Sequence, residues 1–283
     1  MFMEEFRGKR VALIGASHGI GEQMARQMAA AGARLSLADL SGEPIEALGK
    51  QLADNGVNVI TTVVDVRDEA AVEMFAERTF AHFGELDYCF HNAGVSAVGN
   101  VWKIPLADWH WSFDVNVMGP VHSVRAFIPR MIDQDNECHF VITASAAGLI
   151  TSWGGASYSA SKHALIGLAE TLECDLQKAG AKVKNHVVCP GYVLSNLHNS
   201  LDYRPADEWD PADPAYADSD YAEAMQRSTK STGEIGMTTE EAVQIILNQL
   251  ARGDFLILTH PQLGPVIEKR YHNLISGVRP GIA

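Results

Sequence analysis

The chain is poor in positive charge, in cysteine and in long apolar runs. Its 283 residues carry 22 lysines and arginines against 35 aspartates and glutamates, a net charge of −13. Nucleic acids and anionic membrane surfaces attract basic patches, so this balance argues against both as partners. No run approaches the roughly 18 apolar residues of a membrane span, and residues 1–10 lack the apolar core of a signal peptide. We therefore expect a cytoplasmic protein that binds neither nucleic acid nor membranes.

Four cysteines are too few and too scattered for a disulfide framework or a metal site. Cys89, Cys138, Cys174 and Cys189 lie in apolar segments without the spacing of metal ligands. We expect four buried, reduced thiols and no bound metal. The chain is rich instead in apolar material: 47% of its residues are hydrophobic and 20% charged, enough for one large α/β domain or two smaller ones.

The most informative stretch runs from Ser145 to Lys162. From Ser157 onward the apolar residues recur at helical spacing, and Lys162 falls on the same stripe as Tyr158, one turn away. A charge that faces the interior must be paired or used, because its desolvation is costly. A nearby ammonium stabilises a phenolate and lowers the tyrosine pKa from its usual value of about 10. The pattern therefore predicts that Tyr158 acts as a general acid/base.

Ser145 follows an apolar run, residues 140–144, that we expect to be a buried strand. The carboxyl ends of strands in open α/β sheets border the crevice where ligands bind. The hydroxyl of Ser145 is thus placed to hold a substrate oxygen beside Tyr158.

A glycine-rich turn near the N-terminus predicts a dinucleotide site. The apolar run 11–14 leads into Gly15-Ala16-Ser17-His18-Gly19-Ile20-Gly21 and then into a helical pattern. Strand, glycine turn and helix is the arrangement whose backbone N–H groups hold a pyrophosphate.

The next strand, residues 33–38, predicts which dinucleotide binds. It ends at Asp39, about twenty residues after the glycines, where a carboxylate accepts hydrogen bonds from the adenosine ribose and repels a 2′-phosphate. The neighbouring Ser17, Leu40 and Ser41 supply no arginine or lysine. The predicted cofactor is therefore NAD rather than NADP.

The serine, the Tyr-x-x-x-Lys pair and the G-x-x-x-G-x-G turn together resemble the short-chain dehydrogenase/reductase family over about Gly8 to Ser195. The alternating strands and helices and this resemblance imply a Rossmann-like, doubly wound parallel α/β sheet of about seven strands flanked by helices, as a single domain over residues 1–283. The resemblance implies a reversible conversion of a secondary alcohol and a ketone with NAD. Tyr158 would exchange the proton, Ser145 orient the oxygen, and Lys162 bind the nicotinamide ribose.

Further residues carry over from the family by position. Asp65 and Val66 would lie against the adenine, and the sequence from His91 to Gly94 resembles the family's Asn-Asn-Ala-Gly, with His91 in place of the first asparagine. Ile14 stands where the family usually has threonine. Asn116, inside an expected helix from about 106 to 131, would distort that helix and anchor the proton relay from Lys162. The segment from Pro190 to Ser195 would cover the nicotinamide. The expected cofactor-binding set is Gly15, Ser17, His18, Gly19, Ile20, Gly21, Asp39, Leu40, Asp65, Val66, Asn92, Ala93, Gly94, Tyr158, Lys162, Pro190, Gly191, Val193 and Ser195.

Beyond Ser195 the regular pattern weakens. Residues 195–235 show many helix breakers, and the stretch 207–223 carries seven carboxylates and no basic residue. Such a segment is typical of a lid, with a solvated acidic loop as the alternative. Residues 261–283 form a C-terminal extension that we expect to fold over the site or pack on another subunit. The family commonly forms homotetramers through two long helices, here about 106–131 and 157–179, so the resemblance implies a homo-oligomer, a tetramer or a dimer.

The segments expected to line the substrate pocket, 95–102, 146–153 and 192–197, are rich in bulky apolar side chains. They contain Trp102, Leu149, Ile150, Trp153, Tyr192, Leu194 and Leu197. We predict a small-molecule substrate, a bulky apolar, aromatic or steroid-like secondary alcohol or ketone, bound by Ser145, Trp153, Tyr158 and Tyr192. Small cyclic alcohols or polyols are the alternative.

A function of another class is a catalytically silent dinucleotide-binding protein that senses redox state or scaffolds a complex. The complete set of Asn116, Ser145, Tyr158 and Lys162 argues against it, because a binding protein has no use for a tuned proton donor.

Overall fold

A computed structural model describes residues 2–205 and 208–281. Within these residues, seven strands form one sheet in the order β3-β2-β1-β4-β5-β6-β7, and every neighbouring pair is parallel. The strands are β1 (Arg10–Ile14), β2 (Arg34–Asp39), β3 (Val59–Val63), β4 (Tyr88–His91), β5 (Cys138–Thr143), β6 (Val183–Cys189) and β7 (Leu256–Leu258). The predicted doubly wound sheet is confirmed.

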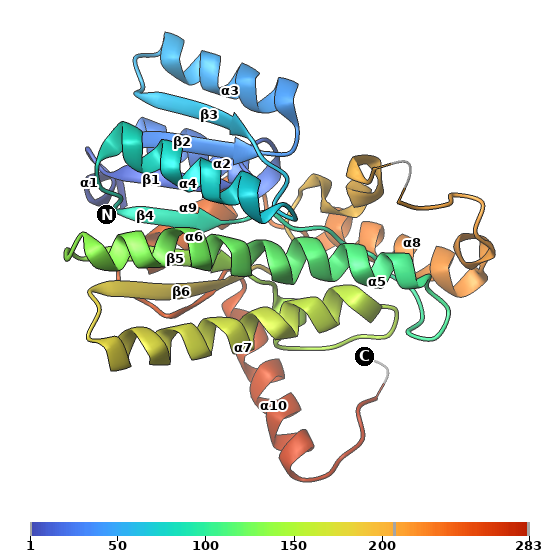
Figure 1. The fold of residues 1–283 in the computed structure, drawn as a ribbon. Helices are drawn as coiled ribbons and strands as arrows, with labels where there is room; N and C mark the ends of the chain where they lie inside the picture. Colours follow the sequence, from blue (N-terminus) through green and yellow to red (C-terminus); the bar gives the residue numbers. More distant parts are fainter. Residues whose placement is uncertain (1, 206–207, 282–283) are drawn as a thin grey trace.

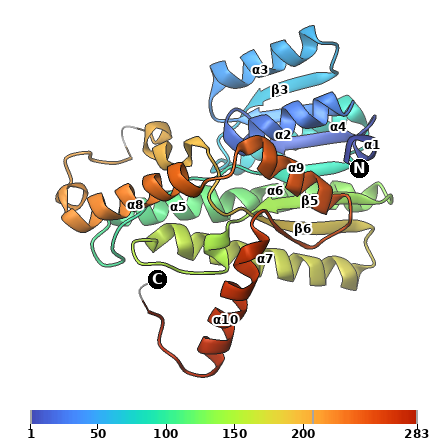
Figure 2. The same cartoon turned by 180° about the vertical axis from the view of Figure 1, so that it is seen from behind.

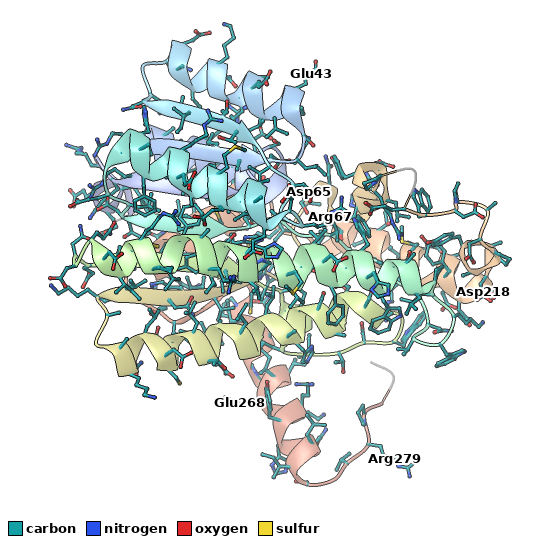
Figure 3. The ribbon with its side chains drawn as sticks, viewed as in Figure 1. Glu43, Asp65, Arg67, Asp218, Glu268 and Arg279 are labelled. Atoms are coloured by element: carbon teal, nitrogen blue, oxygen red, sulfur yellow. The ribbon has the colours of Figure 1, made fainter. Side chains whose placement is uncertain are left out.

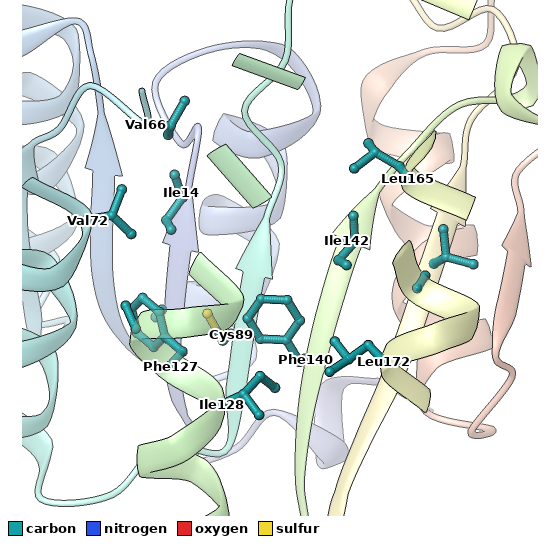
Figure 4. Close-up of a cluster of buried hydrophobic side chains, with 14 of the residues drawn as sticks. Ile14, Val66, Val72, Cys89, Phe127, Ile128, Phe140, Ile142, Leu165 and Leu172 are labelled. Carbon is teal, nitrogen blue, oxygen red and sulfur yellow. The ribbon is translucent and has the colours of Figure 1, made fainter. Parts of the chain in front are cut away.

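Helices cover both faces of the sheet (Figures 1 and 2). They are α1 (Phe2–Glu5), α2 (Gly19–Ala30), α3 (Gly42–Asp54), α4 (Glu69–Phe83), α5 (Leu106–Phe113), α6 (Gly119–Asp133), α7 (Ala156–Ala179), α8 (Ser219–Ile235), α9 (Thr239–Leu250) and α10 (Gly264–Ile275). One buried cluster joins the sheet to α4, α6 and α7 (Figure 4), and a second joins it to α2, α3 and α9. The central strands β4 and β5 are buried at every position, as their continuous apolar sequences require.

The expected helix from 106 to 131 is interrupted at its middle. A π-helical turn, η1 (Asp114–Met118), separates α5 from α6 and contains Asn116. Such turns are rare and occur frequently at functional sites. The distortion expected at Asn116 is therefore present.

The predicted lid differs from the expectation of an irregular segment. After a short 3₁₀ helix, η3 (Asn196–Tyr203), the described residues include the 17-residue helix α8. Only Ala224 is buried along this helix. Its sequence, from Ser219 to Ile235, contains few large apolar residues and therefore gives only a weak apolar pattern at helical spacing. Residues 206–207 of the predicted lid, and Met1 and residues 282–283 of the predicted domain, lie outside the described residues.

The lid is fixed to the body of the protein by a buried ion pair. Arg204 Nη1 lies 2.5 Å from Asp108 Oδ1 on α5, and the two side chains are 0% and 2% exposed. The hydroxyl of Tyr216 donates to the same carboxylate oxygen at 2.6 Å. A paired carboxylate and guanidinium can be buried where either one alone could not, so this contact holds the lid against α5.

Three of the four cysteines are buried, as expected, and Cys174 is not. It lies on α7 two residues after the buried Leu172 and two before the buried Leu176. Two residues along a helix correspond to roughly half a turn, so Cys174 faces away from the core. The expectation that this thiol is buried was wrong.

None of the helices within residues 2–205 and 208–281 is both long and apolar enough to cross a membrane.

Candidate active site

One large cavity of about 650 Å³ opens at the carboxyl ends of the strands. Residues that follow β1, β2, β3, β4, β5 and β6 all line it, among them Gly15, Asp39, Asp65, Asn92 and Ser145. The strand order reverses between β1 and β4, and the glycine turn follows β1. This is the switch point at which doubly wound sheets of the Rossmann-like class bind dinucleotides.

The glycine turn packs its backbone tightly against neighbouring backbone at the cavity, where side chains would not fit. Gly15 has φ +80°, and a Cβ placed there would lie 2.5 Å from the backbone nitrogen of Ala93. A Cβ on Gly21 would lie 1.8 Å from the carbonyl oxygen of Gly15, to which Asn92 Nδ2 donates a hydrogen bond at 3.1 Å. The turn and the start of α2 therefore have the close-packed backbone that fits a dinucleotide phosphate.

Asp39 is held at the end of β2 by two backbone donors. Ser17 N donates to Oδ2 at 2.9 Å and Ser41 N to Oδ1 at 3.0 Å. The carboxylate lines the cavity beside the glycine turn. It is thus placed to accept hydrogen bonds from an adenosine ribose, which supports the fit of NAD.

Asp65 lines the same end of the cavity and binds a cation that sequence reasoning missed. Arg67 Nη2 lies 2.6 Å from Asp65 Oδ2, and its other terminal nitrogen binds Glu208 of the lid (Figure 3). Burial raises the pKa of Asp65, but the hydrogen bonds from Arg67 outweigh it and the pKa is lowered. Arg67 therefore joins the cofactor side of the cavity to the lid through two carboxylates.

Ser145, Tyr158 and Lys162 come together in this cavity. Ser145 begins the 3₁₀ turn η2 (Ala146–Gly148) directly after β5, and Tyr158 and Lys162 lie one turn apart on α7. A Cβ on Gly148 would lie 2.5 Å from the carbonyl oxygen of Lys162, so a glycine is needed for the turn to approach α7 this closely. The serine hydroxyl accepts a hydrogen bond from Ala147 N at 3.1 Å, and both it and Tyr158 line the cavity.

Lys162 is 3% exposed, and its Nζ donates to the carbonyl of Thr143 at 3.2 Å. Burial lowers the pKa of Lys162 to about 8, so the ammonium is still the main form at pH 7. We expected this ammonium to lower the pKa of Tyr158, but in the structure that pKa is raised. Burial raises the pKa of Tyr158, and the neighbouring Ser145 hydroxyl opposes this to a smaller extent. The ammonium of Lys162 is bonded instead to the carbonyl of Thr143.

Asn116 does not line the cavity but joins three elements behind it. Its Oδ1 accepts from Val95 N at 2.8 Å, and its Nδ2 donates to Val95 O and to Ser161 Oγ, both at 2.9 Å. Ser161 Oγ in turn donates to the carbonyl of Tyr158. The side chain thus ties the segment after β4 to the turn of α7 that carries Tyr158 and Lys162.

The other predicted site residues fall into two groups. Those that line the cavity are Gly15, His18, Gly19, Ile20, Asp39, Leu40, Asp65, Val66, Asn92, Ala93, Gly94, Pro190, Gly191, Tyr192, Val193 and Ser195. Ser17, Gly21 and Trp153 do not: Ser17 supports Asp39 through its backbone, Gly21 packs behind Gly15, and the Trp153 ring lies under the guanidinium of Arg227 at 4.5 Å.

The remaining cavity wall comes from the loops after β4 and β5, from α5 and from the lid, and we call it the substrate wall. It comprises the lining residues in segments 95–115, 146–155, 192–235 and 260–263. Its apolar members include Val95, Val98, Trp111, Val115, Ile150, Leu197, Ile235 and Leu263. Of the bulky residues expected here, Trp102, Leu149, Trp153 and Leu194 do not line it. The contribution of α8, with Ala224, Arg227, Ser228 and Thr232, was missed because the lid gave no helical signal.

Comparison with known proteins identifies the family. The profile of the family described as short chain dehydrogenase matches residues 9–205. A CLA biosynthesis dehydrogenase/reductase from Lactiplantibacillus plantarum is 32% identical over 280 residues, 99% of this chain and 98% of that protein. A 1-deoxy-11-beta-hydroxypentalenate dehydrogenase from Streptomyces avermitilis is 34% identical over 250 residues, 87% of this chain and 82% of that protein.

The fold is shared over nearly its whole length with a solved relative. The crystal structure of a short chain dehydrogenase/reductase from Burkholderia phymatum in complex with NAD superposes with a TM-score of 0.94 at 32% identity, covering 99% of this chain and 98% of that one. This chain belongs to the short-chain dehydrogenase/reductase family, and it is an oxidoreductase.

The contacts of Asn116 predict a structural cost for its removal. Replacing Asn116→Ala leaves the N–H and C=O of Val95 without their partners, and the free energy of unfolding should fall by roughly 1–3 kcal/mol because these groups are partly buried. Urea unfolding measures this loss. Asn58→Ala, which removes an exposed asparagine bonded to His82, should cost less than about 0.5 kcal/mol. Equal midpoints for the two variants would contradict the role of Asn116.

Proposed function

We propose that the protein is an NAD-dependent dehydrogenase/reductase that interconverts a secondary alcohol and a ketone on a bulky, largely apolar substrate. The observation that carries this proposal is that Ser145, Tyr158 and Lys162 line the same cavity as the glycine turn and Asp39. A proton donor, an oxygen-binding hydroxyl and a dinucleotide site in one enclosed volume are the requirements for hydride transfer.

Bound NAD would supply the acceptor for the hydride that leaves the alcohol carbon. The residues of the chain hold and move the proton. The Tyr158 oxygen takes the proton of the substrate hydroxyl in oxidation and returns it in reduction, while the Ser145 hydroxyl fixes the same substrate oxygen. The Lys162 ammonium, held by Thr143, is placed to donate to a ribose hydroxyl. Because burial raises the pKa of Tyr158, oxidation should accelerate as the pH rises.

The cofactor assignment is supported by Asp39 and by the relative from Burkholderia phymatum, which was solved with NAD. The substrate assignment is supported by the apolar members of the substrate wall and by a relative named for the oxidation of 1-deoxy-11-beta-hydroxypentalenate. Large apolar side chains such as Trp111, Ile150 and Leu197 in this wall suit an apolar substrate better than a polyol. A silent dinucleotide-binding protein would not need Ser145, Tyr158 and Lys162 in the same cavity as the glycine turn.

The proton-transfer role of Tyr158 gives the most direct test. Tyr158→Phe keeps the ring and removes the hydroxyl, so kcat for oxidation of a steroidal or cyclic secondary alcohol should fall by roughly 10³-fold or more. NADH formation at 340 nm measures turnover, and calorimetry should show NAD binding within about threefold of the wild type. Tyr271→Phe, an exposed position on α10 outside the cavity, is the control. Robust turnover by Tyr158→Phe would remove the phenol from the mechanism.

The carboxylate of Asp39 should decide between NAD and NADP. Asp39→Ser removes the ribose acceptor and the repulsion of a 2′-phosphate, so the ratio of kcat/KM for NAD to that for NADP should drop by about tenfold or more. Asp54→Asn changes an exposed carboxylate that pairs with Lys50 on α3 and should leave this ratio unchanged. The argument fails if the wild-type enzyme prefers NADP.

We also propose a homo-oligomer, a tetramer or dimer. The helix α10 projects from the body (Figures 1 and 2) and has no buried residue along its length. It exposes several large apolar side chains, and the extension beyond it adds another: Val266, Tyr271, Leu274, Ile275 and Val278. Such a surface is typical of a protein interface. Light scattering should give the mass of two or four chains, and Ile275→Asp should lower it; the mass of one chain for the wild type would contradict the proposal.

A further inference from the structure

Arg227 places an unusual charge in the substrate wall. It lies on α8 of the lid and lines the cavity together with Ser228 and Thr232 of the same helix. Its Nη2 donates to the carbonyl of Trp153 at 2.5 Å and to Ser152 Oγ at 3.1 Å. These contacts fix the guanidinium over the Trp153 ring, at 4.5 Å from its centre. The arginine is therefore held in a defined position at the cavity surface.

No carboxylate among the described residues neutralises Arg227. The ion pairs within residues 2–205 and 208–281 leave it out, although Glu223 stands one helical turn before it. Its Nε and Nη1 donate to no protein group in those residues. Arg67, which also lines the cavity, is in contrast paired with Asp65 and Glu208. Arg227 thus retains unused donors.

The substrate wall is also free of negative charge. Among the described lining residues, the only carboxylates are Asp39 and Asp65, and both belong to the cofactor end. This distribution is uneven for a chain with a net charge of −13. The carboxylates on the outer side of the lid are engaged elsewhere: Asp218 and Asp220 pair with Lys103. The wall that faces the substrate therefore offers one guanidinium and no competing carboxylate.

A partly buried guanidinium with free N–H groups attracts an anion. Its planar fork matches a carboxylate in particular, and two parallel N–H···O bonds fix the orientation of the ligand. Clamping the loop at Trp153 uses only Nη2, which leaves the other nitrogens available for this contact. The apolar members of the wall accommodate the remainder of a hydrophobic molecule.

We propose that Arg227 binds a carboxylate of the substrate, which is then a bulky apolar hydroxy acid or the corresponding keto acid. The proposal rests on the proposed dehydrogenase function and narrows its substrate class. Arg227 acts as a specificity residue: it binds the end of the substrate remote from the carbon that is oxidised, while Tyr158 and Ser145 hold the reacting oxygen.

The test compares acids with their methyl esters, which keep the shape and remove the charge. Suitable probes are lithocholate and 12-hydroxyoctadecanoate, each with its methyl ester. Wild-type kcat/KM should be about tenfold or more higher for each acid than for its ester, because a charge-assisted pair is lost in the ester. The difference should lie mainly in KM, since the contact is remote from the reacting carbon.

Variants of α8 locate the effect. Arg227→Gln should remove most of the preference for the acid and leave kcat/KM for the ester within about threefold of wild type, whereas Arg227→Lys should retain part of the preference. Lys230→Gln removes a positive charge from the same helix at an exposed position outside the cavity. It should leave kcat/KM unchanged for both the acid and the ester. Circular dichroism checks that each variant is folded.

Calorimetry with the same probes separates this inference from the proposed function. If the wild type binds the acids more tightly than the esters and Arg227→Gln loses this difference, the carboxylate site is supported even when no probe is oxidised. Binding without oxidation of any probe would count against the dehydrogenase proposal alone. Equal binding and equal turnover of acids and esters overturns the carboxylate site, while oxidation of either leaves the dehydrogenase intact. Failure of both acids to bind also overturns it.

Discussion

The arrangement of the site depends on one buried ammonium. Lys162 is 3% exposed and has no carboxylate partner among the described residues; its polar contact there is the carbonyl of Thr143 at the end of β5. A charge in that position is costly, and the protein lowers its pKa to about 8 rather than neutralise it with an acid. The surrounding backbone is therefore built to tolerate the charge: β5 points a carbonyl at it, and Asn116 fixes the neighbouring segment.

Much of this could be predicted from the sequence because the signals were local. The strands contain short apolar runs, and α7 shows a clear stripe, so the sheet and the positions of Ser145, Tyr158 and Lys162 followed from spacing. The lid could not be predicted in the same way. Helix α8 buries only Ala224, and the contact that fixes the lid joins Arg204 to Asp108, 96 residues apart. Contacts at such separations leave no periodic pattern, and the same reason explains why the contacts of Arg67 with Glu208 and of Arg227 with Trp153 were missed.

The pKa of Tyr158 is raised, although its spacing from Lys162 along the helix predicts that it is lowered. Spacing places an ammonium one turn from the phenol, and Coulomb attraction alone would favour the phenolate. In the structure the ammonium bonds to the carbonyl of Thr143, and burial has the largest effect on the pKa of Tyr158. A sequence gives the distance along the helix, but the direction of a long lysine side chain depends on which acceptor it finds. Here that acceptor is Thr143 of a different element.

Charge is distributed along the cavity so that its two ends favour different partners. At the cofactor end Asp39 is held by two backbone donors and Asp65 by Arg67, so both carboxylates are oriented. At the opposite end Arg227 is oriented by Trp153 and Ser152 but is not neutralised. Arg204 of the lid is paired with the carboxylate of Asp108 and anchors the lid to α5. Arg227 is oriented by neutral groups, so its charge is available to a ligand. The same helix that closes the cavity can therefore also select what enters it.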